Sequence, residues 1–252
     1  MDFQNFQQLS FNNLNCEINY WFRAGNSKKF VIFLHGAGCD HIMFEQQVDM
    51  FDSFYNLIAW DARGHGLSKL ADNQKFEYAD MLSDVLKIFE IHAIEKAVLI
   101  GQSMGGNVAQ DVAYYYPEKV EKLVLIDCTN NTQGLSRFEK WILKHAHTIF
   151  RFYPWKMYIN QGTKVCGKTE YTRNYVRTCL RCFEKQQFVE IMLAVLNALH
   201  EDKNYRFRVP VLLLCGEGDI SGNIKKIVKS WAVVDKNITL KMIRNANHNA
   251  NQ

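Results

Sequence analysis

No stretch of the 252-residue chain approaches the ~20 consecutive apolar residues that are needed to cross a bilayer. The beginning of the chain also has no basic region of the kind that opens a secretory signal. Lys and Arg are nowhere dense enough to form a nucleic-acid-binding tail, and the net charge is only +4. We therefore expect a soluble cytoplasmic protein that engages neither a membrane nor nucleic acid.

The seven cysteines are odd in number and scattered along the chain, which argues against a disulfide framework and favours reduced thiols. Two of them, Cys179 and Cys182, have the spacing of half a redox or zinc site, but no second pair accompanies them. We interpret both as structural residues, and we expect neither a metal nor another cofactor.

Short apolar runs alternate with segments of helical periodicity, and neither a repeat nor a low-complexity tract interrupts this alternation. Such alternation is typical of a parallel sheet covered by helices on both faces. An antiparallel pair at 6–11 and 16–22 precedes the parallel strands. The expected strands are 29–34, 57–60, 97–100, 122–126, 209–215 and 238–243, and the expected helices are 40–51, 78–92, 106–116 and 223–234.

One segment departs from the alternation between Cys128 and Val209, where helical periodicity continues without a convincing strand. It leaves the sheet after one strand and returns at the next, so it would lie over the carboxyl ends of the strands, where open α/β sheets bind ligands. We expect an α/β core of residues 1–129 and 209–252 and a helical cap of residues 130–208. The expected cap helices are 135–152, 168–183 and 184–202.

The segment Gly101-Gln102-Ser103-Met104-Gly105 stands between an expected strand and an expected helix. A serine on such a turn adopts a strained backbone that holds its hydroxyl clear of the chain. A Cβ two residues before or after it would crowd the bend, so glycine is the residue that fits there. An ordinary glycine-rich turn is the simpler alternative, but the flanking strand and helix favour a nucleophilic Ser103.

Four motifs at expected strand ends together resemble the α/β-hydrolase family, and they extend over the whole chain. The resemblance implies a mostly parallel, doubly wound sheet with a helical cap inserted near the carboxyl ends of its strands. The motifs are His35-Gly36-Ala37-Gly38, Asp61-x-Arg63-Gly64-His65-Gly66-x-Ser68, Gly101-Gln102-Ser103-Met104-Gly105-Gly106 and Gly216-Glu217-Gly218-Asp219.

A nucleophilic serine needs a base and an orienting acid, which follow in the order serine, acid, histidine in this fold. Of the eight histidines, only His248 comes after Asp219, and it follows the last expected strand. Asp219, after the strand 211–215, is the first choice for the acid. Asp127, after the preceding strand, is the alternative, because in some α/β-hydrolases the acid resembles Asp127 in its place along the chain. Glu217 is less favoured.

The oxyanion of an acyl-transfer intermediate needs hydrogen-bond donors. The backbone N–H of Met104, at the start of the helix, is well placed for this, and the resemblance implies the backbone N–H of Ala37 as the second donor. We interpret His35 as a residue that holds the oxyanion turn by hydrogen bonding. Asp61 and Arg63 are interpreted as loop-fixing residues, with a salt bridge between them as one way to do this.

Together these residues predict a serine hydrolase that cleaves a carboxylic ester, a thioester or a lactone through an acyl-enzyme. A C–C hydrolase, a lyase related to menaquinone synthesis, a perhydrolase and a slow-turnover ligand receptor would use the same triad. Haloalkane dehalogenases and epoxide hydrolases resemble this fold but have an aspartate at the position of the nucleophilic serine. Ser103 therefore argues against both activities.

The expected cap is basic, with 14 Lys and Arg against 6 Asp and Glu in residues 130–208, a net charge of +8. A solvated helix face is the simpler interpretation. The alternative is that Arg173, Arg177 or Arg181, which share one helix face at a spacing of four, attracts an anionic acyl substrate. The sequence leaves the oligomeric state open.

Overall fold

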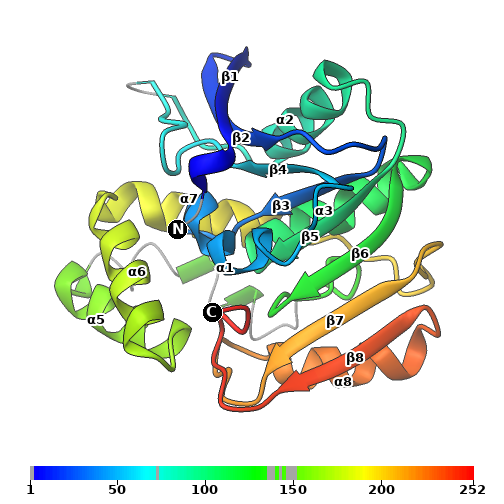
Figure 1. Ribbon diagram of the computed structural model, residues 1–252. Helices are drawn as coiled ribbons and strands as arrows, with labels where there is room; N and C mark the ends of the chain where they lie inside the picture. The colour runs from blue at the N-terminus through cyan, green and yellow to red at the C-terminus, as the bar shows by residue number, and fades with distance from the viewer. Residues whose placement is uncertain (1–2, 72–73, 135–139, 142–143, 146–151) are drawn as a thin grey trace.

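The computed structural model describes residues 3–71, 74–134, 140–141, 144–145 and 152–252. Within these residues, eight strands form one sheet in the order β1-β2-β4-β3-β5-β6-β7-β8 (Figure 1). The strands β1 and β2 form the expected antiparallel pair, β2 is antiparallel to β4, and all later pairings are parallel. The strands are β1 (Gln7–Asn13), β2 (Cys16–Arg23), β3 (Phe30–Leu34), β4 (Asn56–Trp60), β5 (Ala97–Gln102), β6 (Val120–Ile126), β7 (Val211–Gly216) and β8 (Ile238–Ile243).

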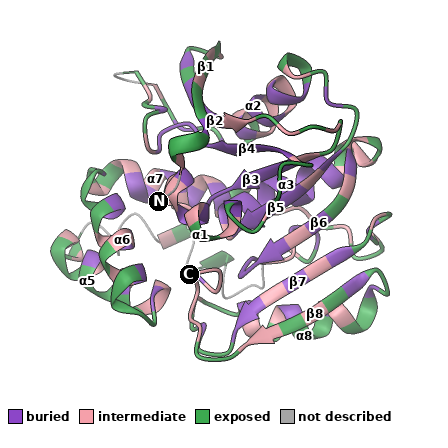
Figure 2. Ribbon diagram, viewed as in Figure 1, coloured by how far each residue is buried: buried purple, intermediate pink, exposed green. Residues whose placement is uncertain are grey.

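The strands β3 and β4 are mostly apolar and buried because both faces of the sheet are covered there. All five residues of β4 are buried, whereas β1 at the edge alternates between exposed and half-buried positions (Figure 2). The helices α2 (Tyr78–Ile91), α3 (Met104–Tyr115) and α8 (Ile224–Val234) pack against one face. The short η2 (His41–Phe44) and α1 (Glu45–Val48) pack against the other.

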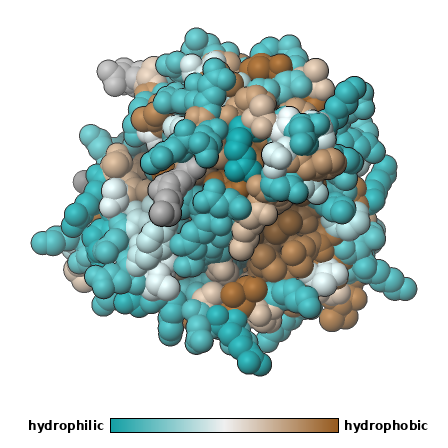
Figure 3. Space-filling model, in the orientation of Figure 1, coloured by the Kyte–Doolittle hydropathy of each residue, from teal (hydrophilic) through white to brown (hydrophobic). Residues whose placement is uncertain are grey.

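One part of the sheet, at β5–β7, presents half-buried apolar residues on the face opposite α3 and α8. Val124 pairs with Leu212, so the two side chains share this face, and Val98 and Leu214 are also half-buried. Figure 3 shows an apolar area over these strands. In the described part of the chain, the helices that contact β6, β7 and β8 most extensively are α3 and α8, which lie on the other face.

Between β6 and β7 the chain forms α5 (Trp155–Cys166), α6 (Glu170–Arg181) and α7 (Lys185–Asn197), which we call the insertion. Figure 1 shows α5 and α6 on the side toward which the arrowheads of β6 and β7 point. The two ends of the insertion are joined by backbone hydrogen bonds, from His200 N to Asn131 O at 2.9 Å and from Asp202 N to Thr132 O at 2.9 Å. The insertion therefore leaves and re-enters the sheet at one place.

The expected helices are confirmed in part. The segment 40–51 forms the two short helices η2 and α1 in place of one long helix, because Asp40 caps a 3₁₀ turn through Ile42 N at 3.0 Å. The sequence interpretation missed α5, although Pro154 directly before it is a usual helix start signal. The expected helix 135–152 lies mostly outside the described residues, while α6 and α7 fall inside the ranges expected for them. None of the described helices has the length and apolarity needed to cross a bilayer.

Candidate active site

Ser103 stands between the last residue of β5 and the first residue of α3 in a left-handed backbone conformation, with φ at 48° and ψ at −116°. A Cβ added to Gly101 would lie 2.4 Å from the carbonyl oxygen of Gly105, and one added to Gly105 would lie 2.0 Å from that of Leu34. Only glycine fits at both positions, as the sequence predicts. The turn therefore has the strained geometry of a nucleophile elbow, and an ordinary loop would not need it.

The imidazole of His248 lies between Ser103 and Asp219. Its Nε2 is 3.0 Å from Ser103 Oγ, and its Nδ1 is 3.1 Å from Asp219 Oδ2. The other oxygen of Asp219 accepts a hydrogen bond from Ser221 N at 2.7 Å. A carboxylate beside Nδ1 holds the proton on that nitrogen and leaves Nε2 to accept the proton of the hydroxyl.

Burial and pairing oppose one another in this group of side chains. Burial alone would lower the pKa of His248, but the hydrogen bond and the negative charge of Asp219 raise it above its usual value, and the charge of Asp127 adds to this. Burial alone would raise the pKa of Asp219, but its hydrogen bond with His248 lowers it. The ionised acid thus favours a proton on His248, which is the state a general base reaches during acyl transfer.

The turn 35–38 lies directly beside the elbow. Gly38 has φ at 75°, and Cys39 N donates to Gly36 O at 3.2 Å. A Cβ on Gly36 would lie 3.3 Å from Ser103 Cβ, so the turn and the nucleophile are in close contact. The first residue of α3 is Met104, whose N–H has no acceptor within the helix because it belongs to the first turn.

With this geometry in place, comparisons with known proteins identify the family. The family model described as "Serine aminopeptidase, S33" matches residues 25–250. The chain belongs to this family of α/β-hydrolases. The resemblance that the four motifs indicated is therefore confirmed, as is the α/β-hydrolase fold.

Curated relatives match this chain over part of its length. The match to epoxide hydrolase 4 of Mus musculus is 33% identical over 125 residues, which is 49% of this chain and 34% of that protein. The match to 3-oxoadipate enol-lactonase 1 of Acinetobacter baylyi is 36% identical over 85 residues, which is 34% of this chain and 31% of the relative. These matches thus span about a third of the length of the curated relatives.

Solved structures resemble this chain over nearly its whole length. An esterase from Exiguobacterium antarcticum superposes with a TM-score of 0.78 at 16% identity, covering 96% of this chain and 92% of that one. At this identity the likeness concerns the fold alone. The chemistry of the site therefore has to be argued from its own residues.

The two alternative acids lie apart from the imidazole nitrogens. Asp127 accepts Gly216 N on Oδ1 at 2.8 Å and Ala250 N on Oδ2 at 2.9 Å, so the backbone occupies both oxygens. Glu217 is exposed, and its carbonyl oxygen accepts Lys225 Nζ at 3.1 Å. The structure thus brings Asp219, the first choice, to His248 Nδ1.

A contact that the sequence interpretation missed holds the segment carrying His248. The last carbonyls of a helix have no partner within it, and those of α5 accept hydrogen bonds from residues 247–249. On the other side of this segment, Gln102 Nε2 donates to His248 O at 2.9 Å. The bonds to α5 are Asn247 Nδ2 to Lys164 O at 2.9 Å, His248 N to Val165 O at 3.3 Å and Asn249 N to Cys166 O at 2.9 Å.

His35 is fully buried and bonds to the turn 35–38, as expected, and also to the loop after β4. Its Nδ1 donates to Gly36 O at 2.8 Å, and its Nε2 accepts Ala62 N at 3.0 Å. Burial lowers the pKa of His35, which keeps the ring neutral. A neutral ring with both nitrogens occupied holds the turn and has no capacity left for proton transfer.

The expected salt bridge between Asp61 and Arg63 is wrong, because each residue pairs elsewhere. Asp61 Oδ1 accepts both His41 N at 2.9 Å and His41 Nδ1 at 2.8 Å, and its Oδ2 accepts Leu67 N at 2.7 Å. The guanidinium of Arg63 instead binds both oxygens of Asp84, at 2.7 and 2.8 Å. Both residues still fix loops, so their interpreted role is confirmed with different partners.

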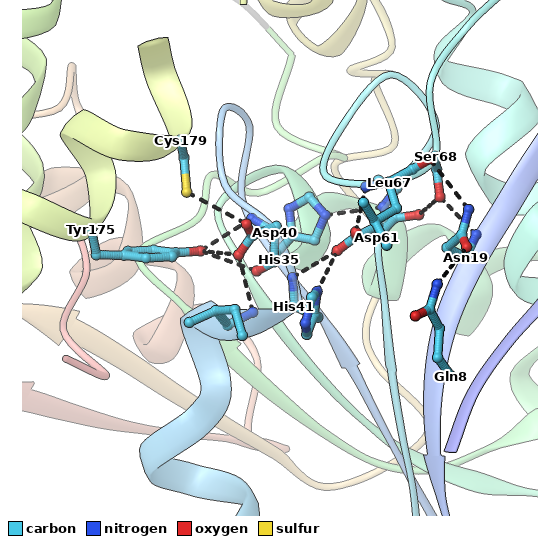
Figure 4. A network of polar contacts seen from close by, with 12 residues as sticks. Gln8, Asn19, His35, Asp40, His41, Asp61, Leu67, Ser68, Tyr175 and Cys179 are labelled. Atoms are coloured by element: carbon cyan, nitrogen blue, oxygen red, sulfur yellow. Dashed lines mark hydrogen bonds and ion pairs between the residues drawn. The ribbon is translucent and has the colours of Figure 1, made fainter. Parts of the chain in front are cut away.

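The insertion contacts the turn 35–38 and the residues after it through α6. Tyr175 OH donates to Asp40 Oδ1 at 2.9 Å, and Cys179 Sγ lies 3.7 Å from Asp40 Oδ2. Figure 4 shows these contacts beside those of His41 and Asp61. A Cβ on Gly38 would lie 2.7 Å from a side-chain carbon of Leu180 and of Phe188, so apolar side chains of α6 and α7 cover the turn.

The three arginines of α6 lie away from its buried face, which includes Val176 and Leu180. Arg173 Nε donates to Gly167 O at 2.9 Å, Arg177 donates to a neighbouring asparagine, and Arg181 is exposed. These positions favour the solvated helix face over the anion-binding alternative.

The cysteines and carboxylates of the site are engaged by protein partners. Cys179 is buried and Cys182 is exposed, which fits the structural interpretation. Ligand atoms of Asp127, Cys215 and Asp219 lie within 4.8 Å of one another. However, burial raises the pKa of Cys215 to about 12, and both carboxylates already accept backbone N–H groups. We therefore assign no metal to this cluster.

Proposed function

We propose that this protein is a cofactor-independent serine hydrolase that cleaves a carboxylic ester, a thioester or a lactone. The observation that carries the proposal is the continuous contact from Asp219 through His248 to Ser103, at 3.1 and 3.0 Å. The strained backbone of Ser103 adds a second feature that an inert serine would not need.

In the proposed reaction, Ser103 Oγ attacks the acyl carbonyl while His248 Nε2 takes the hydroxyl proton. Asp219 holds the imidazole in the required tautomer and stabilises the imidazolium that forms. The N–H groups of Met104 and Ala37 stabilise the oxyanion, each by ~3 kcal/mol in the transition state. His248 then protonates the leaving group, and a water molecule activated by the same imidazole releases the acyl group.

We also propose that residues 130–208 act as a cap over this site. Apolar residues of α6 and α7 cover Gly38, and the end of α5 binds the segment that carries His248. The insertion therefore contacts the oxyanion turn and the base at once. An apolar acyl or alcohol group would fit beside these apolar side chains of α6 and α7.

The named activities of the relatives support hydrolysis without selecting the bond. An enol-lactonase among them supports acyl transfer to water, and an epoxide hydrolase points to a different electrophile. Ser103 at the elbow favours the acyl route, because an epoxide hydrolase resembles this fold with an aspartate there. C–C hydrolysis, the lyase, perhydrolysis and slow-turnover binding remain the alternatives on the same three side chains.

The decisive experiment compares p-nitrophenyl acetate and butyrate turnover by the protein and by Ser103→Ala. We expect steady turnover by the former and background rates for the variant. A burst without turnover favours the receptor alternative, and equal rates for both proteins overturn the proposal. A panel of esters, thioesters and lactones of different chain length and charge then identifies the preferred bond.

A further inference from the structure

Asp127 stands at the end of β6 with φ at 44°, and its side chain is fully buried. Its Oδ1 accepts Gly216 N at 2.8 Å, and its Oδ2 accepts Ala250 N at 2.9 Å. Gly216 is the last residue of β7, three positions before Asp219. Ala250 is two positions after His248. One carboxylate therefore joins the backbone that leads to the acid and the backbone that follows the base.

We propose that Asp127 is a positioning residue. Its carboxylate holds the backbone segments that carry Asp219 and His248 in a fixed position relative to each other. This inference rests on the proposed function, because it concerns the placement of the proposed base. Asp127 makes no hydrogen bond to the imidazole that the structure records, and Asp219 occupies His248 Nδ1. Its action is thus indirect, through Gly216 and Ala250.

The charge of Asp127 is costly in this place. Burial raises its pKa to about 7 despite the nearby His248 and the two backbone donors, and Asp219 adds to the rise. The other titratable groups that face it are thiols of three elements, Cys128, Cys166 and Cys215, and burial raises the pKa of each. These thiols are uncharged near neutrality, so the charges around Asp127 are those of Asp219 and His248.

Two consequences distinguish this role from a purely structural one. The ionised carboxylate accepts at both oxygens, so it ties Gly216 to Ala250 more firmly than a protonated carboxyl group. Its negative charge also favours the imidazolium of His248. Loss of the charge should therefore misplace the base and lower its pKa.

The first test compares Asp127→Asn with Asp235→Asn. Asp235 is a matched control because it is also buried and accepts two backbone N–H groups, from Phe207 at 2.8 Å and Asn237 at 3.0 Å. We expect kcat for p-nitrophenyl butyrate to fall by roughly 10- to 100-fold in Asp127→Asn with KM changed by less than about twofold. The control should keep kcat within about twofold of the unchanged protein.

The second test needs no turnover, and its main measurement needs no variant. In NMR titrations of the unchanged protein, the amide protons of Gly216 and Ala250 should shift together with one midpoint near pH 7, because both donate to the same carboxylate. Separate midpoints for the two amides overturn the proposal. The imidazole of His248, identified with His248→Gln, should also titrate at lower pH in Asp127→Asn.

These outcomes separate this inference from the proposed function. If esters are not hydrolysed but the amide and imidazole shifts occur as expected, the proposed function is overturned and the positioning role of Asp127 is retained. If turnover depends on Ser103 but Asp127→Asn retains full kcat and an unchanged His248 titration, the positioning role is overturned and the hydrolase stands.

Discussion

Two buried carboxylates fix the two halves of the site, and they differ in their electrostatic surroundings. Asp61 follows β4 and holds His41, just after the turn 35–38, and Leu67 in its own loop. Asp127 follows β6 and holds the backbone around the base through Gly216 and Ala250. Each accepts backbone N–H groups on its carboxylate, and each is fully buried.

The partners make the difference. Burial alone would raise the pKa of Asp61, but its hydrogen bonds with His41 outweigh this, and the pKa lies below the usual value. Asp127 has Asp219 beside it and no side-chain donor that outweighs burial, so its pKa is raised to about 7. The Asp61 carboxylate should therefore stay ionised near neutrality, while the Asp127 carboxyl titrates there.

The largest expected effect concerns the chemistry on the Asp127 side. His248→Gln should lower kcat for p-nitrophenyl butyrate by about 10⁴- to 10⁶-fold, because the serine loses its base. His92→Gln is the matched control, because His92 lies at the end of α2 and contacts Tyr20. This variant should retain full kcat. A loss of less than tenfold in His248→Gln would contradict the assignment of the base.

The next effect concerns stability on the Asp61 side. Asp61→Asn places an amide donor among three hydrogen bonds that need acceptors, so the free energy of unfolding should fall by about 3 kcal/mol. Urea unfolding measures this, with the exposed Asp52→Asn as a control expected to lie within about 0.5 kcal/mol of the unchanged protein. An equal fall in both variants would remove the distinction between the buried and exposed carboxylates.

The pH dependence of stability sharpens the comparison directly. The folded pKa of Asp127, about 7, exceeds the value of about 4 in an unfolded chain, so its contribution to stability falls as pH rises from about 4 to 7. Relative to the unchanged protein, Asp127→Asn should therefore gain about 2 kcal/mol between pH 5 and pH 8.

Asp61→Asn should show no such slope in that range. Its folded pKa is lowered, so the stability that its ionised form contributes is lost only as pH falls below about 4. Urea unfolding at pH 5, 6, 7 and 8 measures both differences. Parallel curves for the two variants would show that the carboxylates do not differ in the way described.

The smallest effect is expected away from both carboxylates, on the exposed side of α6. Replacing Arg173, Arg177 and Arg181 together by Ala should leave KM within about twofold for neutral esters and for esters with a free carboxylate. The reason is that Arg173 and Arg177 are hydrogen-bonded within the insertion and Arg181 is exposed. A selective rise in KM for the acidic esters would instead support the alternative that these arginines attract an anionic substrate.

Local sterics and strand order made much of the site predictable. Glycine is needed at position 101 because of the backbone of Gly105 and Gly106, a few residues along the chain, which a short motif records, whereas at position 105 it is needed because of the distant backbone of Leu34. Alternating apolar runs indicated the parallel sheet, and the position of His248 after the last strand indicated the base. These features depend on neighbours along the chain or on the order of elements, so the sequence contained them.

What only the tertiary structure decided is the choice among partners that are distant in sequence. The sequence put both Asp127 and Asp219 at strand ends and favoured Asp219; the fold brought Asp219 to His248 and directed the Asp127 carboxylate to backbone N–H groups. Arg63 binds Asp84 for the same reason, since several carboxylates compete for one guanidinium. Such choices depend on side-chain directions and distances that arise after the chain has packed, whereas the need for glycine at position 101 is set by Gly105 and Gly106, a few residues along the chain.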